Sequence, residues 1–457
     1  MTPLVSSGTT RPRGAPRIGI LGHVGNGNLG DEAIIAAVIE SIRRRVPAAD
    51  ICCFTSNPAD TRARHGVPSF PLRRATGRSE TVGTAAGEMA RRALPSGALA
   101  VLQLLQRAAK RVPAVSAAGR AARRAWRAGV ASAREPAFVL GAYRQLKGMD
   151  LLLVAGSQQL IDYVPGKAWG HPYTLFKWTA LARSRRTRIA FVSCGAGPIT
   201  TRLGKYFIRR ALTAADFRSY RDESSRACVE SIGAPKNDRV VPDLVFGLSG
   251  GCTPEAPDPA ERERVVAINP VPFVDPSYWV GASRRNYESF VSSLGEFAIW
   301  LGGRGYTVFF FPTQLRADPP VIDDLKRYLQ DAENSGRSRP KLLEVPVCSH
   351  ETLMRALSMA DFVVATRFHG VVLSYLLGKP AVGIAYADKT RALMEQMGQG
   401  DLALDLLDLE PAALADRIEY LEALGAASAR DLQQRLTVQR SALEAQYDEI
   451  FRLLAVR

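Results

Sequence analysis

Three side chains that lie close together in the sequence could bind an anion and move a proton: Arg367, His369 and Lys389. Arginine and lysine carry positive charge at neutral pH, and histidine titrates near it. The surrounding residues predict a strand at 362–366, then a polar turn that carries Arg367 and His369, then an apolar helix at 371–378. In α/β proteins such a turn often binds ligands, because backbone N–H groups and the helix dipole converge there. We therefore expect a small anion that undergoes proton transfer.

A glycine-rich loop follows the first predicted strand, which covers residues 17–22. Residues 25–30 match the dinucleotide-binding pattern GxGxxG. However, Asp31 and Glu32 place negative charge at the start of the next helix, and the following strand ends without the acid that would bind a ribose. The loop is therefore not expected to bind NAD(P) or FAD.

Three polar residues of this region are nevertheless candidate substrate contacts. His23 is expected to face the cleft. Asn28 fits either a turn or a contact with the acceptor substrate. Asp31 fits either a helix N-cap or a substrate ligand. The sequence leaves both alternatives open.

The order of strands and helices predicts an α/β protein with two Rossmann-like domains that face a cleft. The first domain covers residues 17–248 and follows a predicted disordered leader at 1–16, which has no apolar signal core. The second domain, residues 265–457, restarts with an apolar strand and ends with three helical segments. The glycine- and proline-rich residues 249–264 are the predicted linker.

The first domain contains an insertion of different composition at residues 72–146. Residues 71–148 carry fifteen lysines and arginines against three acids, which is most of the net charge of +16. The insertion fits either a solvated helical segment or a lid that contacts an anionic membrane or a lipid-phosphate acceptor. Nucleic acid is not expected, because Trp126 is the only aromatic residue between Phe70 and Phe138 and base stacking needs several.

The bulk sequence predicts a cytoplasmic globular protein that could work at the inner face of the membrane. No apolar run reaches the roughly 20 residues that a transmembrane helix needs. The six cysteines show no CxxC spacing, which favours reduced thiols over disulfides or zinc. No cluster of carboxylates and histidines indicates a metal site, so none is predicted.

Several segments occur in an order that is informative together. They are GNLGDEAI near the N-terminus, GAGPI, SYRDESS, VPDLVF, ATRFHGVVLSYLLGKP and the Y-x-x-K pair formed by Tyr386 and Lys389. With these segments the chain resembles the polysaccharide pyruvyl transferases over most of its length outside residues 72–146. These enzymes transfer a pyruvyl group from phosphoenolpyruvate to sugar hydroxyls and have two-lobed, glycosyltransferase-B-like folds. The resemblance implies the same fold and reaction type here.

The resemblance also implies roles for individual residues. His369 is similar to the acid/base residue of the family, and Arg221 and Lys389 are similar to the residues that hold the donor. The remaining candidate substrate contacts are Arg367, Asn28, Asp31, Tyr386, Asp162 and His23. The implied partners are phosphoenolpyruvate and a saccharide acceptor, either free or lipid-linked, and no cofactor or metal is implied.

One segment departs from the family pattern. A run of two or three glycines usually precedes a polar loop and an aspartate, whereas here the sequence is Ala155-Gly156-Ser157, with Asp162 retained. Serine leaves less space than glycine for the close approach of a backbone or a ligand. Substrate contacts in this loop are therefore expected to differ.

Two other functions fit parts of the sequence. A glycosyltransferase of the same fold that uses a nucleotide sugar would need an acid to bind the ribose, and Glu395 is the nearest candidate. A non-enzymatic scaffold of a membrane-bound polysaccharide assembly would use the basic residues 72–146 and would bind lipid without His369 or Lys389.

Overall fold

The computed structural model describes residues 15–22, 24–74, 135–163, 166–249, 263–272 and 283–455. His23 lies outside these residues, and so do nearly all of the predicted leader and most of the predicted insertion and linker. Contacts within the chain divide it into two units: Met1–Phe70 together with Gly148–Arg457, and Pro71–Lys147. All the candidate site residues lie in the first of these units.

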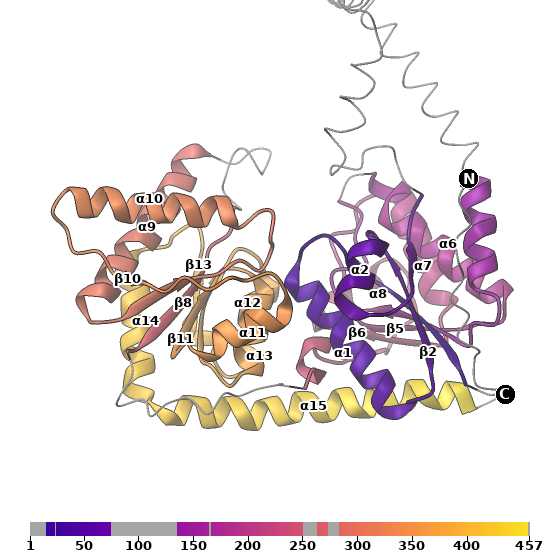
Figure 1. Ribbon diagram of the computed structural model, residues 1–457. Helices are drawn as coiled ribbons and strands as arrows, with labels where there is room; N and C mark the ends of the chain where they lie inside the picture. Colours follow the sequence, from indigo (N-terminus) through magenta and orange to yellow (C-terminus); the bar gives the residue numbers. More distant parts are fainter. Residues whose placement is uncertain are drawn as a thin grey trace, which may run out of the picture. The chain divides into compact units, whose positions relative to one another are not determined.

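Seven strands form the first sheet, in the order β3-β2-β1-β4-β5-β6-β7 (Figure 1). They are β1 (Arg17–Leu21), β2 (Asp50–Thr55), β3 (Ser69–Pro71), β4 (Leu151–Ala155), β5 (Arg188–Cys194), β6 (Phe217–Tyr220) and β7 (Arg239–Val240). The pairs from β2 to β7 are parallel. The central strand β4 is buried along its whole length, as expected for a parallel sheet that is covered on both faces.

Six strands form the second sheet, in the order β10-β9-β8-β11-β12-β13, and every pair is parallel. They are β8 (Val265–Asn269), β9 (Thr307–Phe310), β10 (Lys341–Leu342), β11 (Phe362–Ala365), β12 (Ala381–Ala385) and β13 (Ala403–Asp405). The predicted α/β class with two Rossmann-like sheets is therefore confirmed.

The helices connect successive strands and pack on the sheets (Figure 1). The first sheet is accompanied by α1 (Leu29–Arg45), α2 (Pro58–His65), α6 (His171–Ser184), α7 (Arg202–Thr213), α8 (Glu223–Ser231) and the 3₁₀ turns η1 (Lys167–Trp169) and η2 (Leu244–Gly247). The second is accompanied by α9 (Arg284–Gly303), α10 (Pro319–Asn334), α11 (His350–Ser358), α12 (Phe368–Leu376), α13 (Asp388–Gln396), η3 (Gly400–Leu402) and α14 (Pro411–Leu424). Within the described residues, no helix is long and apolar enough to cross a bilayer.

The last helix, α15 (Ala426–Ala455), contacts elements of both sheets (yellow in Figure 1). It packs on α12 and α14, and also on η2 and β5. Gln446 anchors it to the first sheet, because its amide donates to Ser193 Oγ at 3.2 Å and its carbonyl oxygen accepts from Ser219 Oγ. Leu443 on the same helix is fully buried and lies next to Gly247.

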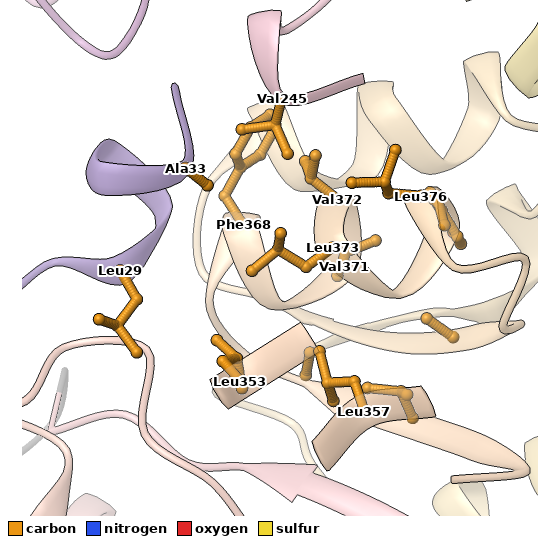
Figure 2. Close-up of a cluster of buried hydrophobic side chains, with 14 of the residues drawn as sticks. Leu29, Ala33, Val245, Leu353, Leu357, Phe368, Val371, Val372, Leu373 and Leu376 are labelled. Atoms are coloured by element: carbon orange, nitrogen blue, oxygen red, sulfur yellow. The ribbon is translucent and has the colours of Figure 1, made fainter. Parts of the chain in front are cut away.

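Apolar side chains from the two sheets share one continuous core. Figure 2 shows where α1 meets α12: Ala33 from α1 lies close to Phe368 from α12 and Val245 from η2, and Leu29 lies one turn earlier on α1. All four side chains are buried. The start of α12, where the sequence predicts a binding turn, is therefore packed against the first helix of the chain.

Backbone hydrogen bonds join the same two regions. Leu29 N donates to Thr313 O and Leu315 N donates to Gly27 O, both at 2.8 Å, and these bonds enclose a short antiparallel bridge between Asn28 and Gln314. Backbone N–H and C=O groups thus hold the glycine-rich loop against the loop after β9. A change of side chain in either loop would leave these groups in place.

We predict that Leu443→Ala lowers the free energy of unfolding by about 2–5 kcal/mol, because it leaves a cavity between α15 and η2. Val438→Ala is the matched control on α15, since Val438 is 66% exposed and such changes cost less than about 0.5 kcal/mol. Urea unfolding followed by circular dichroism measures both values. Equal midpoints for the two variants would contradict this packing.

Candidate functional site

His369 lies in the first turn of α12, and its ring is pressed against the backbone of α1. A Cβ atom added at Gly30 would overlap Cβ, Cγ and Nδ1 of His369. Only glycine therefore lets the two helices approach this closely. The GNLGDE segment and the RFHG segment, which are far apart in the sequence, form one site at this contact.

Asp243 is the carboxylate between His369 and Arg221. Its Oδ1 accepts from Val245 N at 3.0 Å, which fixes the side chain at the start of η2. Its Oδ2 lies 3.8 Å from His369 Nε2 and 3.6 Å from Arg221 Nη1. Both Oδ2 and Nε2 are buried and make no hydrogen bond with any described residue. The Asp243 carboxylate is therefore close to both His369 and Arg221, but its Oδ2 is too far from either side chain to form a hydrogen bond.

Arg221 is a buried cation at the end of β6. Its Nε donates to Asp222 at 3.3 Å and its Nη2 donates to Gln158 Oε1 at 3.1 Å. Its guanidinium carbon lies 4.4 Å from the centre of the Phe368 ring, a cation–π distance. The position of this charge is thus defined from three directions.

Lys389 approaches the same aromatic ring from α13. Its Nζ lies 5.7 Å from the centre of Phe368. Burial, reinforced by the nearby Arg221, lowers the pKa of Lys389 to about 8. The lysine is therefore mainly charged at neutral pH but loses its proton within an accessible pH range.

A cavity of about 620 Å³ opens beside these cations. Its walls come from β6–α8, η2, α12 and α13, and they consist of Arg221, Asp222, Glu223, Ser224, Val240, Asp243, Phe368, Lys389, Ala392, Leu393 and Gln396. The helices α12 and α13 begin here, and no side chain caps either of them. Uncapped helix N-termini and two cations make this wall suitable for an anion. His369 does not line the cavity, but its Nε2 lies 3.8 Å from Oδ2 of Asp243, which does.

The two groups at the helix contact have pKa values shifted in opposite directions. Burial lowers the pKa of His369, and the Asp243 and Asp31 carboxylates oppose this effect. Burial raises the pKa of Asp31, and His369 and a hydrogen bond from Ser157 oppose this effect. His369 thus favours its neutral form, and the neighbouring Asp31 keeps its proton to a higher pH than a carboxyl group usually does. Proton-transfer sites combine groups of this kind.

A family model described as polysaccharide pyruvyl transferase matches residues 28–388. The chain belongs to the polysaccharide pyruvyl transferase family. The match begins at the residue that caps α1 and ends one residue before Lys389. Family membership confirms the resemblance and makes this protein a transferase of polysaccharide biosynthesis.

Solved structures with the same architecture have little sequence in common with this transferase. The UDP-GlcNAc 2-epimerase from Neisseria meningitidis bound to UDP-GlcNAc is 10% identical, with a TM-score of 0.52 over 97% of this chain and 100% of that chain. A glycosyltransferase from Rickettsia africae ESF-5 is 9% identical, with a TM-score of 0.52 over 97% and 100%. These similarities show the fold alone, and they confirm the predicted glycosyltransferase-B-like class.

Two other predicted residues of the transferase support the backbone around the site. Asn28 is the N-cap of α1, with Oδ1 accepting from Gly30 N at 3.1 Å. Arg367 donates through Nε and Nη2 to Asp318, at 3.0 and 2.5 Å. Asp318 in turn accepts from the backbone of Thr313, in the loop bonded to Leu29. Both residues thereby position the contact between α1 and α12.

Asp162 and Tyr386 lie away from the cavity wall. Asp162 is fully buried, and hydrogen bonds from Thr200 and Thr201 keep its pKa low although burial alone would raise it. Tyr386 lines a separate cavity of about 160 Å³ together with Arg391. The structure thus brings Arg221, His369, Lys389 and Asp31 together, and not Asp162 or Tyr386.

Ser157, the departure from the family pattern, contacts the site through Asp31. Its backbone has a φ of 55°, a left-handed conformation that favours glycine, and Gly156 before it has a φ of 43°. Its Oγ donates to Asp31 Oδ1 at 2.7 Å. The serine thus occupies a position suited to glycine and provides a hydrogen bond that glycine could not.

Sequence reasoning missed Asp243, Phe368 and Gln158 as members of the site. Asp243 and Phe368 lie within the VPDLVF and RFHG segments, so the family resemblance pointed to the right stretches without separating these residues from their neighbours. Gln158 follows the altered glycine run, and only its bond to Arg221 shows its role.

We predict that Asp243→Asn lowers the pKa of His369, because it removes a negative charge that favours the protonated imidazole. NMR titration of the five histidines measures this value, with His369→Gln to assign the signal. Asp401→Asn, at an exposed position on η3, is the control and leaves the value unchanged. An unchanged or higher His369 pKa in Asp243→Asn would contradict the proximity of the two groups.

Proposed function

We propose that this transferase moves the pyruvyl group of phosphoenolpyruvate onto two hydroxyls of a sugar, forming a cyclic ketal and releasing phosphate. The observation that carries the proposal is the convergence of Arg221 and Lys389 on the Phe368 ring, next to His369 and beside two uncapped helix starts. Family membership supports the same reaction class.

Two cations on the cavity wall suit this donor, and they share the wall with three carboxylates, Asp222, Glu223 and Asp243. Phosphoenolpyruvate carries a phosphate and a carboxylate, so it needs more than one cation in a confined space. Arg221 and Lys389 supply two cations, and the starts of α12 and α13 supply backbone N–H groups. We place the phosphate between these groups, where its charge is offset as it leaves.

The size and polarity of the cavity leave room for an acceptor. At about 620 Å³ it lies within the usual range of roughly 300–1,000 Å³ for small-molecule sites and exceeds what a three-carbon donor fills. Glu223, Ser224 and Gln396 on its wall can hydrogen-bond to sugar hydroxyls. We therefore place a sugar ring of a polysaccharide or glycolipid precursor on the side of α8 and α13.

The chemistry requires three proton movements. One proton adds to C3 of the donor, which becomes a methyl group, while a sugar hydroxyl bonds to C2 and releases its proton. The bond between C2 and the phosphate oxygen then breaks, and a second hydroxyl bonds to C2 and releases its proton. One released proton replaces the proton added to C3, and the other leaves with phosphate or solvent. No oxidation state of the protein changes, and the reaction calls for no organic cofactor or metal.

We assign the relay of these protons to His369. Its lowered pKa makes the neutral imidazole available to accept a proton from a hydroxyl, and the negative charge of a bound donor favours the protonated form afterwards. Asp31 and Asp243 flank the ring, and both stabilise the imidazolium. The donor reaches His369 past the carboxylate of Asp243, which lines the cavity. Because phosphoenolpyruvate is an intracellular metabolite, the proposal places the reaction in the cytoplasm.

The decisive test incubates the protein with phosphoenolpyruvate and candidate sugars and follows phosphate release together with the mass of the ketal product. We predict that His369→Ala lowers kcat by about 10²–10⁴-fold, the usual contribution of a general acid/base. His350→Ala, which alters a buried histidine that lies next to Glu351 and not next to Asp243, is the matched control. Full turnover by His369→Ala would exclude the assigned role. Turnover of a nucleotide sugar without any turnover of phosphoenolpyruvate would favour the glycosyltransferase alternative instead.

We further predict that kcat/KM for phosphoenolpyruvate falls as the pH rises through about 8, because Lys389 then loses the charge that binds the donor. Below this pH the lysine is protonated and the donor site is complete. Lys389→Arg keeps its charge and moves the alkaline limb to higher pH, whereas Lys326→Arg, which lies outside the cavity, leaves it in place. An identical limb in Lys389→Arg would assign the titration to another group.

A further inference from the structure

A cluster of aromatic side chains lies on η1, α6 and α7, at positions that do not line the cavity. The centres of neighbouring rings are between 5.1 and 6.3 Å apart. The members are Trp169, Tyr173, Phe176, Tyr206 and Phe207. Because α6 and α7 pack side by side (Figure 1), the rings form one continuous group.

The outer members of this cluster are exposed to solvent. Trp169 is 66% exposed and Tyr206 is 44% exposed, and Leu203, one turn before Tyr206 on α7, is 37% exposed. Phe207 is buried beneath them and fixes their position. Contiguous exposed apolar side chains of this size commonly mark an interaction site.

The charged side chains of α7 are all positive. The exposed face of α7 carries Arg202, Lys205, Arg209 and Arg210, and α7 contains no acidic residue. None of these four residues forms an ion pair with any described residue. We use the name α7 surface for the four basic residues together with Trp169, Leu203 and Tyr206.

We propose that the α7 surface docks on an anionic membrane. A cationic helix with exposed tryptophan, tyrosine and leucine has the composition of an interfacial anchor, in which the aromatic rings lie at the level of the headgroups and the basic side chains contact lipid phosphates. None of its residues belongs to 72–146, the segment for which the sequence analysis considers membrane contact as one of two alternatives.

Other occupants fit the α7 surface less well. A neutral saccharide needs acceptors for its hydroxyl hydrogens beside the aromatic ring, and the charged side chains of α7 are donors only. A single nucleic-acid strand needs a row of open ring faces, whereas Trp169 already contacts Tyr173 and Phe207. Clustered positive charge with an apolar centre is complementary to a negatively charged bilayer surface.

This inference does not depend on the proposed donor or on the cavity residues. Docking would bring the protein to acceptors that are anchored in the membrane. Protein and acceptor would then meet by diffusion along the membrane surface and not through the surrounding solution. The α7 variants below therefore retain turnover of a water-soluble acceptor, since none of the residues involved lines the cavity.

The test measures co-sedimentation of the full chain with vesicles of phosphatidylcholine alone and with vesicles of phosphatidylcholine mixed with phosphatidylglycerol. We expect binding to the mixed vesicles only, weakened by added salt. Arg209→Gln and Arg210→Gln each weaken it about fivefold, and the double variant Trp169→Ala/Tyr206→Ala abolishes most of it. The matched controls Arg430→Gln and Tyr420→Ala, which alter exposed residues of α15 and α14, leave binding unchanged.

A second readout reports the contact directly. The emission of Trp169 moves to shorter wavelength when mixed vesicles are added, and the difference disappears in Trp169→Phe. Unchanged binding by all the α7 variants would overturn the proposal and assign membrane contact to another part of the chain. Absence of binding to mixed vesicles, or equal binding to both kinds of vesicle, would overturn it as well.

Discussion

The close approach of α1 and α12 at Gly30 is the constraint on which the site depends. A side chain at this position would overlap His369, so a missing Cβ atom sets the separation of the two helices. Once they are in contact, Ala33 and Phe368 join one apolar core (Figure 2). The Phe368 ring then lies close to Arg221 at the end of a strand and to Lys389 on another helix. The contact between α1 and α12 therefore both completes the apolar core and positions the groups of the site.

Buried charge is the cost of this arrangement, and the structure offsets it by pairing. Arg221 has carboxylates on two sides, and Asp31 has a hydroxyl donor in Ser157. One oxygen of Asp243 and one nitrogen of His369 are left without a hydrogen bond among the described residues. Unsatisfied polar atoms are destabilising in a folded core, and sites of this kind persist where a ligand or a reaction makes use of them.

Much of this fold follows from local sequence, because apolar strands and amphipathic helices alternate and each carries its own signal. Arg367, His369 and Lys389 could also be found locally, since all three lie around one strand–turn–helix unit. The directions in which these side chains point could not be predicted from the local sequence. Arg367 points to Asp318, a buried carboxylate in a different loop, and only tertiary packing decides that choice. Similarly, the hydrogen bond from Ser157 to Asp31 joins segments 126 positions apart in the sequence, so the residues beside Ser157 do not reveal it.

The anchoring of α15 to the first sheet has a consequence for how the chain is made. The ribosome synthesises α15 after every strand of the described residues, yet Gln446 and Leu443 complete the surroundings of β5, β6 and η2, which leave the ribosome much earlier. Part of the apolar surface of the first sheet therefore stays uncovered until α15 has been synthesised. A premature stop codon within α15 would therefore damage the first sheet, which is made long before α15.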